Sequence, residues 1–310
     1  MIKFCHVDHT GASRKYYLAV LKYIQRHPAL YGVEVEIISL SEFINKGTPP
    51  FTDVLSYQTF PDEWNEKKFN YKTIYQADAR FHVFSGTKIL VDVHDNGDCD
   101  AFTRMYAGRE LPRVKCFPSK WFLENYNVIL LSTVSANPGV ILDNVYRDIE
   151  ISCKFGKKQR GYYDHTIRES VEQHLQETTY DVDYDWVEGK SKYFEELERT
   201  LIVIGAPGWG AHNASYWGAM KAGALLFAHR TLNDIKLFPH SDLIEDVDYV
   251  SYDLFNFKAK LRRVINDRKE IDFIRNNGRR KFEMGLNFRK SANQLVDYLK
   301  GGGNNEQKFM

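Results

Sequence analysis

The sequence lacks any apolar run of the about 20 residues that a membrane-spanning helix needs, and it is poor in cysteine. Its four cysteines, Cys5, Cys99, Cys116 and Cys153, form no CxxC pair. They therefore indicate reduced thiols and not a disulfide framework or a zinc site. Residues 1–8 turn polar too early for a signal peptide, whose apolar stretch has about 7–15 residues. We expect a soluble, cytoplasmic protein.

The sequence also lacks a dominant charge. Its 42 basic and 41 acidic residues leave a net charge of +1, so no whole-protein field draws it to nucleic acid or to a membrane. Hydrophobic residues make up 43% and aromatic residues 14%, which is enough for a large core and excludes disorder over most of the chain. A length of 310 residues corresponds to two ordinary domains or one large one.

Strand and helix patterns alternate along the chain. A polar loop and a helical pattern follow the first strand, and residues 45–80 form an irregular insertion carrying a helix or a hairpin. The strand and helix order restarts near residue 149, where a second αβ half begins. The predicted strands are 2–7, 33–40, 88–93, 113–117, 128–131, 149–154, 201–204 and 224–228. The predicted helices of the second half are 164–176, 191–199, 214–222, 254–266, 268–280 and 291–299.

This order predicts an α/β protein with two Rossmann-like, doubly wound domains facing a cleft. The domains are expected at residues 1–145 and 146–300, followed by a disordered Gly/Asn/Gln-rich tail at 301–310. Helix 214–222 is expected to end at Gly223, a C-cap. Ligands of such sheets bind at the carboxyl ends of the strands, so the cleft is the expected site.

Motifs of the second half are similar to those of a known family. They are Tyr193–Leu197, Ser215–Leu226, Asp242–Ile244, Asp248–Asp253 and Asn276–Arg279, in that order. This half resembles the nucleotide-sugar half of GT-B-fold glycosyltransferases, in the branch with a spore-maturation or exostosin-like C-terminal domain. Two positions depart from the family pattern, since its usual Arg falls on Ser215 and its usual Glu on Gly218. The departures imply an altered donor mode or an inactive site.

The first half is similar to the N-terminal domains of the same enzymes. The similarity lies in Ile89–Asp95, Asp100–Phe102 and Val114–Pro118. The resemblance implies that residues 1–145 bind the acceptor and residues 146–300 the nucleotide sugar.

Two loops of the second half have the composition of a diphosphate site. The glycines of loop 205–213 allow backbone N–H groups to approach an anion, and the next helix adds its N-terminal dipole. In loop 156–161, Lys157 and Arg160 could neutralise the leaving diphosphate in place of a metal. The alternatives are a plain strand-to-helix turn and a solvated basic loop. The predicted donor-binding residues are Gly156, Lys157, Arg160, Gly208, Trp209, Gly210, His212, Asn213 and Ser215.

Polar residues that follow two strands of the first half are candidates for the base. An inverting transferase needs a group that deprotonates the acceptor hydroxyl, and Asp8, His9 and Asp95 are suitably placed at strand ends. The neighbouring Gly11 and His94 are predicted to bind the acceptor. The alternative is that the carboxylates cap turns.

A divalent metal or another cofactor is not expected beyond the nucleotide-sugar co-substrate. Asp98 and Asp100 follow a strand and resemble a metal-binding pair. Similar pairs within 181–185 and at Asp246 and Asp248 fit chance in an Asp-rich chain. We expect no metal at any of them.

The segment 258–290 is rich in Lys and Arg. It could contact a membrane surface peripherally, or it could form an ordinary solvated helix pair. Stable nucleic-acid binding is not expected.

The sequence thus predicts a metal-independent enzyme, a hexosyl- or pentosyltransferase of glycan biosynthesis. It would move a sugar from a nucleoside diphosphate, preferably UDP, to a glycan, glycolipid or protein hydroxyl. Two alternatives are a catalytically silent glycosyltransferase-like module that binds a carbohydrate or a partner, and a glycosyltransferase acting on DNA bases.

Overall fold

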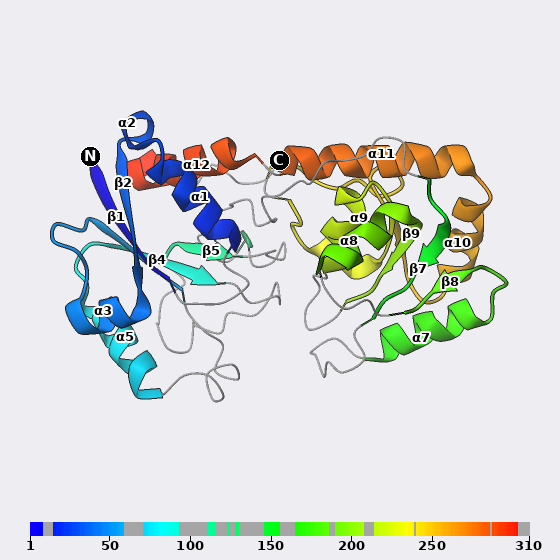
Figure 1. Cartoon of the computed structure of the whole chain (residues 1–310), viewed down its shortest axis with the longest axis horizontal. Coiled ribbons are helices and arrows are strands. Elements are labelled where there is room, and N and C mark those ends of the chain that lie inside the picture. Colours follow the sequence, from blue (N-terminus) through cyan, green and yellow to red (C-terminus); the bar gives the residue numbers. More distant parts are fainter. Residues whose placement is uncertain are drawn as a thin grey trace.

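The computed structural model describes two parallel β-sheets, each flanked by helices (Figure 1). The described residues are 1–8, 15–58, 71–92, 111–115, 123–124, 128–129, 146–155, 165–185, 190–207, 214–238, 240–285 and 287–302. All strand pairs in both sheets are parallel. The predicted α/β class is therefore confirmed.

The first sheet has six strands in the order β2-β1-β3-β4-β5-β6. The strands are β1 (Ile2–Asp8), β2 (Val33–Ser39), β3 (Val54–Gln58), β4 (Thr87–Asp92), β5 (Arg113–Lys115) and β6 (Val128–Ile129). The helices are α1 (Lys15–Gln25), α2 (Pro28–Tyr31), α3 (Leu40–Lys46) and α5 (Tyr71–Val83).

Alternation along β1 separates two apolar layers. Phe4 belongs to a core shared with α1 and α2, whereas Cys5 and Val7 belong to a core shared with α3 and α5. Because successive side chains of a strand point to opposite faces, helices cover both faces of this sheet.

The second sheet has five strands in the order β11-β10-β9-β7-β8. They are β7 (Ile149–Ser152), β8 (Val182–Asp183), β9 (Thr200–Gly205), β10 (Leu225–His229) and β11 (Val250–Tyr252). The helices are α7 (His165–Gln176), α8 (Lys190–Arg199), α9 (Ala214–Lys221), α10 (Phe257–Ile265) and α11 (Arg268–Gly285), with a 3-10 turn at Arg230–Asp234. Every residue of β9 and β10 is buried, as expected for strands covered on both faces.

The last long helix, α12 (Phe288–Asp297), joins the first sheet and not the second. Its Ala292, Leu295 and Val296 are buried in the core that contains α1. Figure 1 shows α11 beside the second sheet and α12 continuing across to the first. The sequence analysis assigned residues up to 300 to the second domain. No local pattern in the sequence indicates that α12 returns to the first sheet.

Several short elements differ from the sequence prediction. The segment 45–80 was predicted as an irregular insertion carrying a helix or a hairpin. It contains most of the helix α5, and it also contributes β3, an unpredicted strand inside the first sheet. The short strands β8 and β11 were not predicted either. A strand of two to five residues that carries polar side chains, such as Ser56 in β3, gives too little periodicity to be recognised. The predicted C-cap Gly223 is confirmed, with φ of +65°.

The passage from α11 to α12 is tightly packed. A Cβ on Gly285 would lie 2.6 Å from the Phe238 ring, so only glycine fits there without rearrangement. His240, in the segment after β10, lies with Nε2 3.0 Å from the hydroxyl of the fully buried Ser291 of α12. This contact joins the segment after β10, in the second half of the chain, to α12, which packs on the first sheet. Among the described residues, no helix combines the length and the apolar character needed to cross a bilayer.

His240 predicts an acid-sensitive contribution to folding. Burial, followed by the charges of Lys290 and Lys236, lowers its pKa to about 4 from an ordinary value of about 6.5. Between these values the unfolded chain takes up a proton that the folded chain refuses, so stability falls as the pH falls. We expect His240→Gln to remove up to about 2 kcal/mol of this loss between about pH 6.5 and pH 4.

Urea denaturation at several pH values would measure the effect. His27→Gln, at an exposed histidine, is the control and should keep the wild-type pH dependence. An identical pH dependence in His240→Gln and wild type would contradict the assignment.

Candidate functional site

The strand order of each sheet reverses at one place. In the first sheet this place lies between β1 and β3, and in the second between β7 and β9, because β2 and β8 lie on the outer sides of β1 and β7. The connections leave in opposite directions there, and ligands of open α/β sheets bind at the carboxyl ends of the strands beside such a point. Two places are therefore candidate ligand sites. One lies where β1 and β3 end, and the other lies where β7 and β9 end.

The predicted loops follow these edges directly in the sequence. Asp8 ends β1 and is half-buried, with one carboxylate oxygen shielded from solvent. Ser215 lies in the first turn of α9 and is buried. The other predicted site residues lie outside the described residues: His9, Gly11, His94, Asp95, Gly156, Lys157, Arg160, Gly208, Trp209, Gly210, His212 and Asn213. Their roles stay predictions.

The backbone where β9 ends is held by two tyrosines. A Cβ on Gly205 would lie 2.5 Å from the Tyr216 ring, so this residue must be glycine for α9 to pack against the strand. The hydroxyl of Tyr252, from β11, donates a hydrogen bond to the Gly205 carbonyl at 2.9 Å. The chain therefore enters the predicted phosphate loop from a fixed starting point.

Arg168 of α7 joins the ends of β7 and β9. Its Nε donates to the Pro207 carbonyl at 2.8 Å, and its guanidinium carbon lies 5.4 Å from the centre of the Phe155 ring. Burial lowers the pKa of this guanidinium, yet arginine keeps its charge at neutral pH. A desolvated cation at this edge is suited to an anionic ligand.

The sequence analysis missed Arg168, although a signal was present. Arg168, Val171 and Leu175 are three and four residues apart, and Val171 and Leu175 are buried on α7. A charged residue on the apolar stripe of a helix is costly unless something holds it there. The exception to the pattern marked the site.

Lys154, just after β7, is the shared cation of two ion pairs. Its side chain is 2% exposed and pairs with Asp183, at 2.8 Å, and with Glu196 of α8. Burial alone would lower the pKa of this ammonium, but the hydrogen bonds to both carboxylates raise it above its ordinary value. Lys154 therefore connects β7, β8 and α8 and does not offer a charge to a ligand.

The two departures from the family pattern carry different weight. A Cβ on Gly218 would lie 3.1 Å from the Leu197 side chain and 3.6 Å from the Phe194 ring, both on α8. A glutamate at 218 would thus enter an apolar helix contact and not the edge of the sheet. The Gly218 departure therefore gives no argument for an inactive site, and the altered or inactive site implied by the two departures stays a prediction.

The described Asp pairs have structural partners. Asp183 binds Lys154 and accepts from the Asp185 backbone, at 2.9 Å. Asp246 pairs with Arg263 at 2.7 Å, and the buried Asp248 accepts from the Ile244 backbone at 2.8 Å. In the part of the chain that the structure describes, no group of three or more His, Cys, Asp or Glu could hold a metal. Asp98 and Asp100 lie outside that part.

Carboxylates neutralise much of the basic run at 258–290. Paired cations are Lys258, Lys260, Arg263, Arg268, Arg275, Arg279 and Lys281, with partners just after α7, on α11 and near β11. This is the arrangement of a solvated helix pair.

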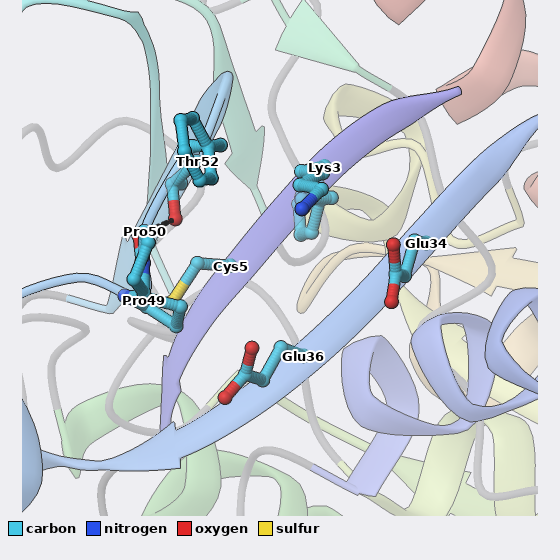
Figure 2. A pocket seen from close by; sticks show the side chains of 9 residues that line it. Lys3, Cys5, Glu34, Glu36, Pro49, Pro50 and Thr52 are labelled. Atoms are coloured by element: carbon cyan, nitrogen blue, oxygen red, sulfur yellow. Dashed lines mark hydrogen bonds between the residues drawn. The ribbon is translucent and has the colours of Figure 1, made fainter.

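A hollow of about 270 Å³ lies on the first sheet, near the opposite ends of its strands (Figure 2). Lys3, Cys5, Glu34 and Glu36 line it together with residues 49–52. Glu34 and Glu36 make it unsuitable for a phosphate, and its place beside the first residues of β1 and β2 puts it away from the carboxyl edge. We assign it no part in the site.

Solved structures share this fold over the full length of the chain. A glycosyltransferase from Rickettsia africae has a TM-score of 0.57 at 9% identity, covering 98% of this chain and 99% of its own. Anabaena HepE, solved in complex with UDP-glucose, has a TM-score of 0.56 at 9% identity, covering 97% and 100%. A protein described as a UDP-N-acetylglucosamine 2-epimerase from Listeria monocytogenes has a TM-score of 0.55 at 10% identity, covering 100% and 99%.

No family profile matches the sequence, and neither does any curated protein. The structural likeness confirms the predicted GT-B fold with its two Rossmann-like sheets. At 9–10% identity it establishes the fold, and one of the three neighbours carries the name of a different activity.

The Lys154 contacts predict a large loss of stability on substitution. Lys154→Met leaves two carboxylates without their cation at the end of β7, which should cost about 3–5 kcal/mol of unfolding free energy. Chemical denaturation followed by circular dichroism would measure it. Lys258→Met, which breaks an exposed pair with Glu177, is the control and should cost about 0–1 kcal/mol. Equal losses in the two variants would contradict the structural role of Lys154.

Proposed function

We propose that the chain is a glycosyltransferase that takes a sugar from a nucleoside diphosphate, preferably UDP. The observation that carries the proposal is Arg168, a desolvated cation held between Pro207 and Phe155 where β7 and β9 end. A diphosphate leaving group gains negative charge as its bond to the sugar breaks. A prepositioned guanidinium stabilises that charge without reorganising.

The fold neighbours support the nucleotide part of the proposal. HepE was solved with UDP-glucose, and the same protein was solved with UDP. In our proposal Lys157 and Arg160 add to the charge of Arg168, and loop 208–213 offers backbone N–H groups to the phosphates. With this much positive charge the leaving group needs no divalent metal.

The acceptor belongs to the first sheet in this proposal. Asp8 lies at the end of β1 beside the point where the strand order reverses, where a carboxylate can take the proton of an attacking hydroxyl. His9 and Asp95 stay candidates for the same role, with Gly11 and His94 beside the acceptor.

A glycan or protein acceptor fits better than a glycolipid. A glycolipid would require contact with a membrane surface, and ion pairs neutralise much of the basic run that was a candidate for that contact. We place the reaction in the cytoplasm, where the buried free thiols of Cys5 and Cys153 would stay reduced.

Donor binding tests the proposal directly. We expect UDP and UDP-glucose to raise the melting temperature in EDTA, without added Mn²⁺. Arg168→Gln should weaken UDP binding about 10- to 100-fold, the effect of losing a charged hydrogen bond of about 1.5–3 kcal/mol. Titration calorimetry would measure it, with Arg280→Gln on the exposed side of α11 as the control.

Each of the other outcomes would indicate a different function. UDP binding without release of UDP from any UDP-sugar would indicate the catalytically silent module. Conversion of UDP-N-acetylglucosamine to its epimer would indicate a different reaction on the same fold. Salt-sensitive binding of duplex DNA would revive the DNA-base transferase. Failure of UDP to bind wild type would refute the donor site itself.

A further inference from the structure

Three polar side chains meet inside the first sheet's core, directly beneath the proposed acceptor edge. His6 of β1, Ser56 of β3 and Tyr17 of α1 are 1%, 0% and 5% exposed. His6 Nδ1 lies 2.7 Å from the Ser56 hydroxyl, and the Tyr17 hydroxyl donates to the same oxygen at 3.1 Å. The His6 and Tyr17 rings meet edge to face, with centroids 5.1 Å apart.

One of these two hydrogen bonds has a fixed direction. Burial raises the pKa of the Tyr17 hydroxyl above its ordinary value, so Tyr17 keeps its proton and donates it to Ser56. The Ser56 oxygen has two lone pairs, so it can accept from Tyr17 and either donate to His6 Nδ1 or accept from it, according to the tautomer of His6. In either tautomer the hydrogen bond at Nδ1 orients the imidazole ring from one side.

The position of the trio within the sheet is informative. His6 and Ser56 are register partners on the two strands beside the reversal of strand order. Along β1 one face carries Phe4, then His6, then Asp8, because alternate residues share a face. Phe4 lies among apolar neighbours, so polarity on this face increases toward the end where the strand leaves the sheet.

The trio also joins β1, which ends at Asp8, to α1, the next described helix along the chain. Asp8 comes immediately before residues 9–14, and Tyr17 follows them in the first turns of α1. Ser56 therefore connects the strand before residues 9–14 and the helix after them. Three apolar side chains could fill the same space without the free-energy cost of burying polar groups. Packing alone therefore does not explain why polar side chains are present here.

We propose that His6, oriented by Ser56 and Tyr17, is a positioning residue for the acceptor end of the site. It acts through the end of β1, setting the placement of Asp8. This inference rests on the proposed function, since it assigns His6 a role in that reaction. His6 itself is too buried to touch a substrate.

The test separates positioning from stability. Ser56→Ala removes the shared hydroxyl, and Tyr17→Phe removes one hydrogen bond while keeping the ring. We expect both to lower the turnover of UDP-glucose or UDP-N-acetylglucosamine, with water as acceptor, about 10- to 100-fold. The dissociation constant for UDP should not change, because the donor edge belongs to the other sheet.

Two further variants serve as rescue and control. Ser56→Thr keeps the hydroxyl and should restore most of the turnover. Tyr31→Phe removes a buried hydroxyl from the same core without touching the trio, and should leave the turnover unchanged. Wild-type turnover in both Ser56→Ala and Tyr17→Phe would overturn the proposal.

A nitrogen-15 spectrum of the histidines gives a readout that needs no activity. The Nδ1 signal of His6 should be that of a hydrogen-bonded nitrogen in wild type and should shift in Ser56→Ala, which lacks the partner hydroxyl. Identical Nδ1 signals of His6 in wild type and Ser56→Ala would overturn the proposal. Failure of wild type to bind UDP would instead count against the proposed function, so the two failures are distinguishable.

Discussion

Parallel pairing of the strands fixes where chemistry can occur in this molecule. Because the strands of each sheet run the same way, all their carboxyl ends lie along one edge, and the strand order reverses only between β1 and β3 and between β7 and β9. The first of these edges ends in a carboxylate, Asp8, and the second is spanned by a cation, Arg168. In the proposed reaction Asp8 would take the proton of the acceptor hydroxyl and Arg168 would stabilise the negative charge of the diphosphate.

The proposed donor side of the site, where β9 ends, depends on packing among residues of the protein itself. Gly205 allows the Tyr216 ring to approach the strand, Tyr252 binds the Gly205 carbonyl, and Arg168 binds the Pro207 carbonyl. These contacts come from α9, β11 and α7, so three separate elements fix the backbone at Gly205 and Pro207. A loop that starts from a fixed backbone can present its N–H groups with little loss of entropy on binding.

The features predicted from sequence were those with strong local signals. The fully buried β9 and β10 were recognisable as apolar runs, and Gly223 as the residue that ends α9. The strand β3 was not recognisable, because its polar Ser56 belongs to a buried network whose partners lie on other elements. The return of α12 to the first sheet was hidden for a related reason, since an amphipathic pattern shows that a helix packs but not against which sheet.

Gly218 shows why a motif has to be interpreted together with side-chain direction. In one dimension it occupies the place of a family glutamate, which suggests a lost function. In three dimensions its missing side chain would point at Leu197 and Phe194 on α8. Fold neighbours with different named activities share these sheets at 9–10% identity, so neither the fold nor a loosely aligned motif decides the reaction. The reaction depends on the side chains where the strands end, and in this chain Arg168, which the sequence motifs do not include, lies there in contact with Pro207 and Phe155.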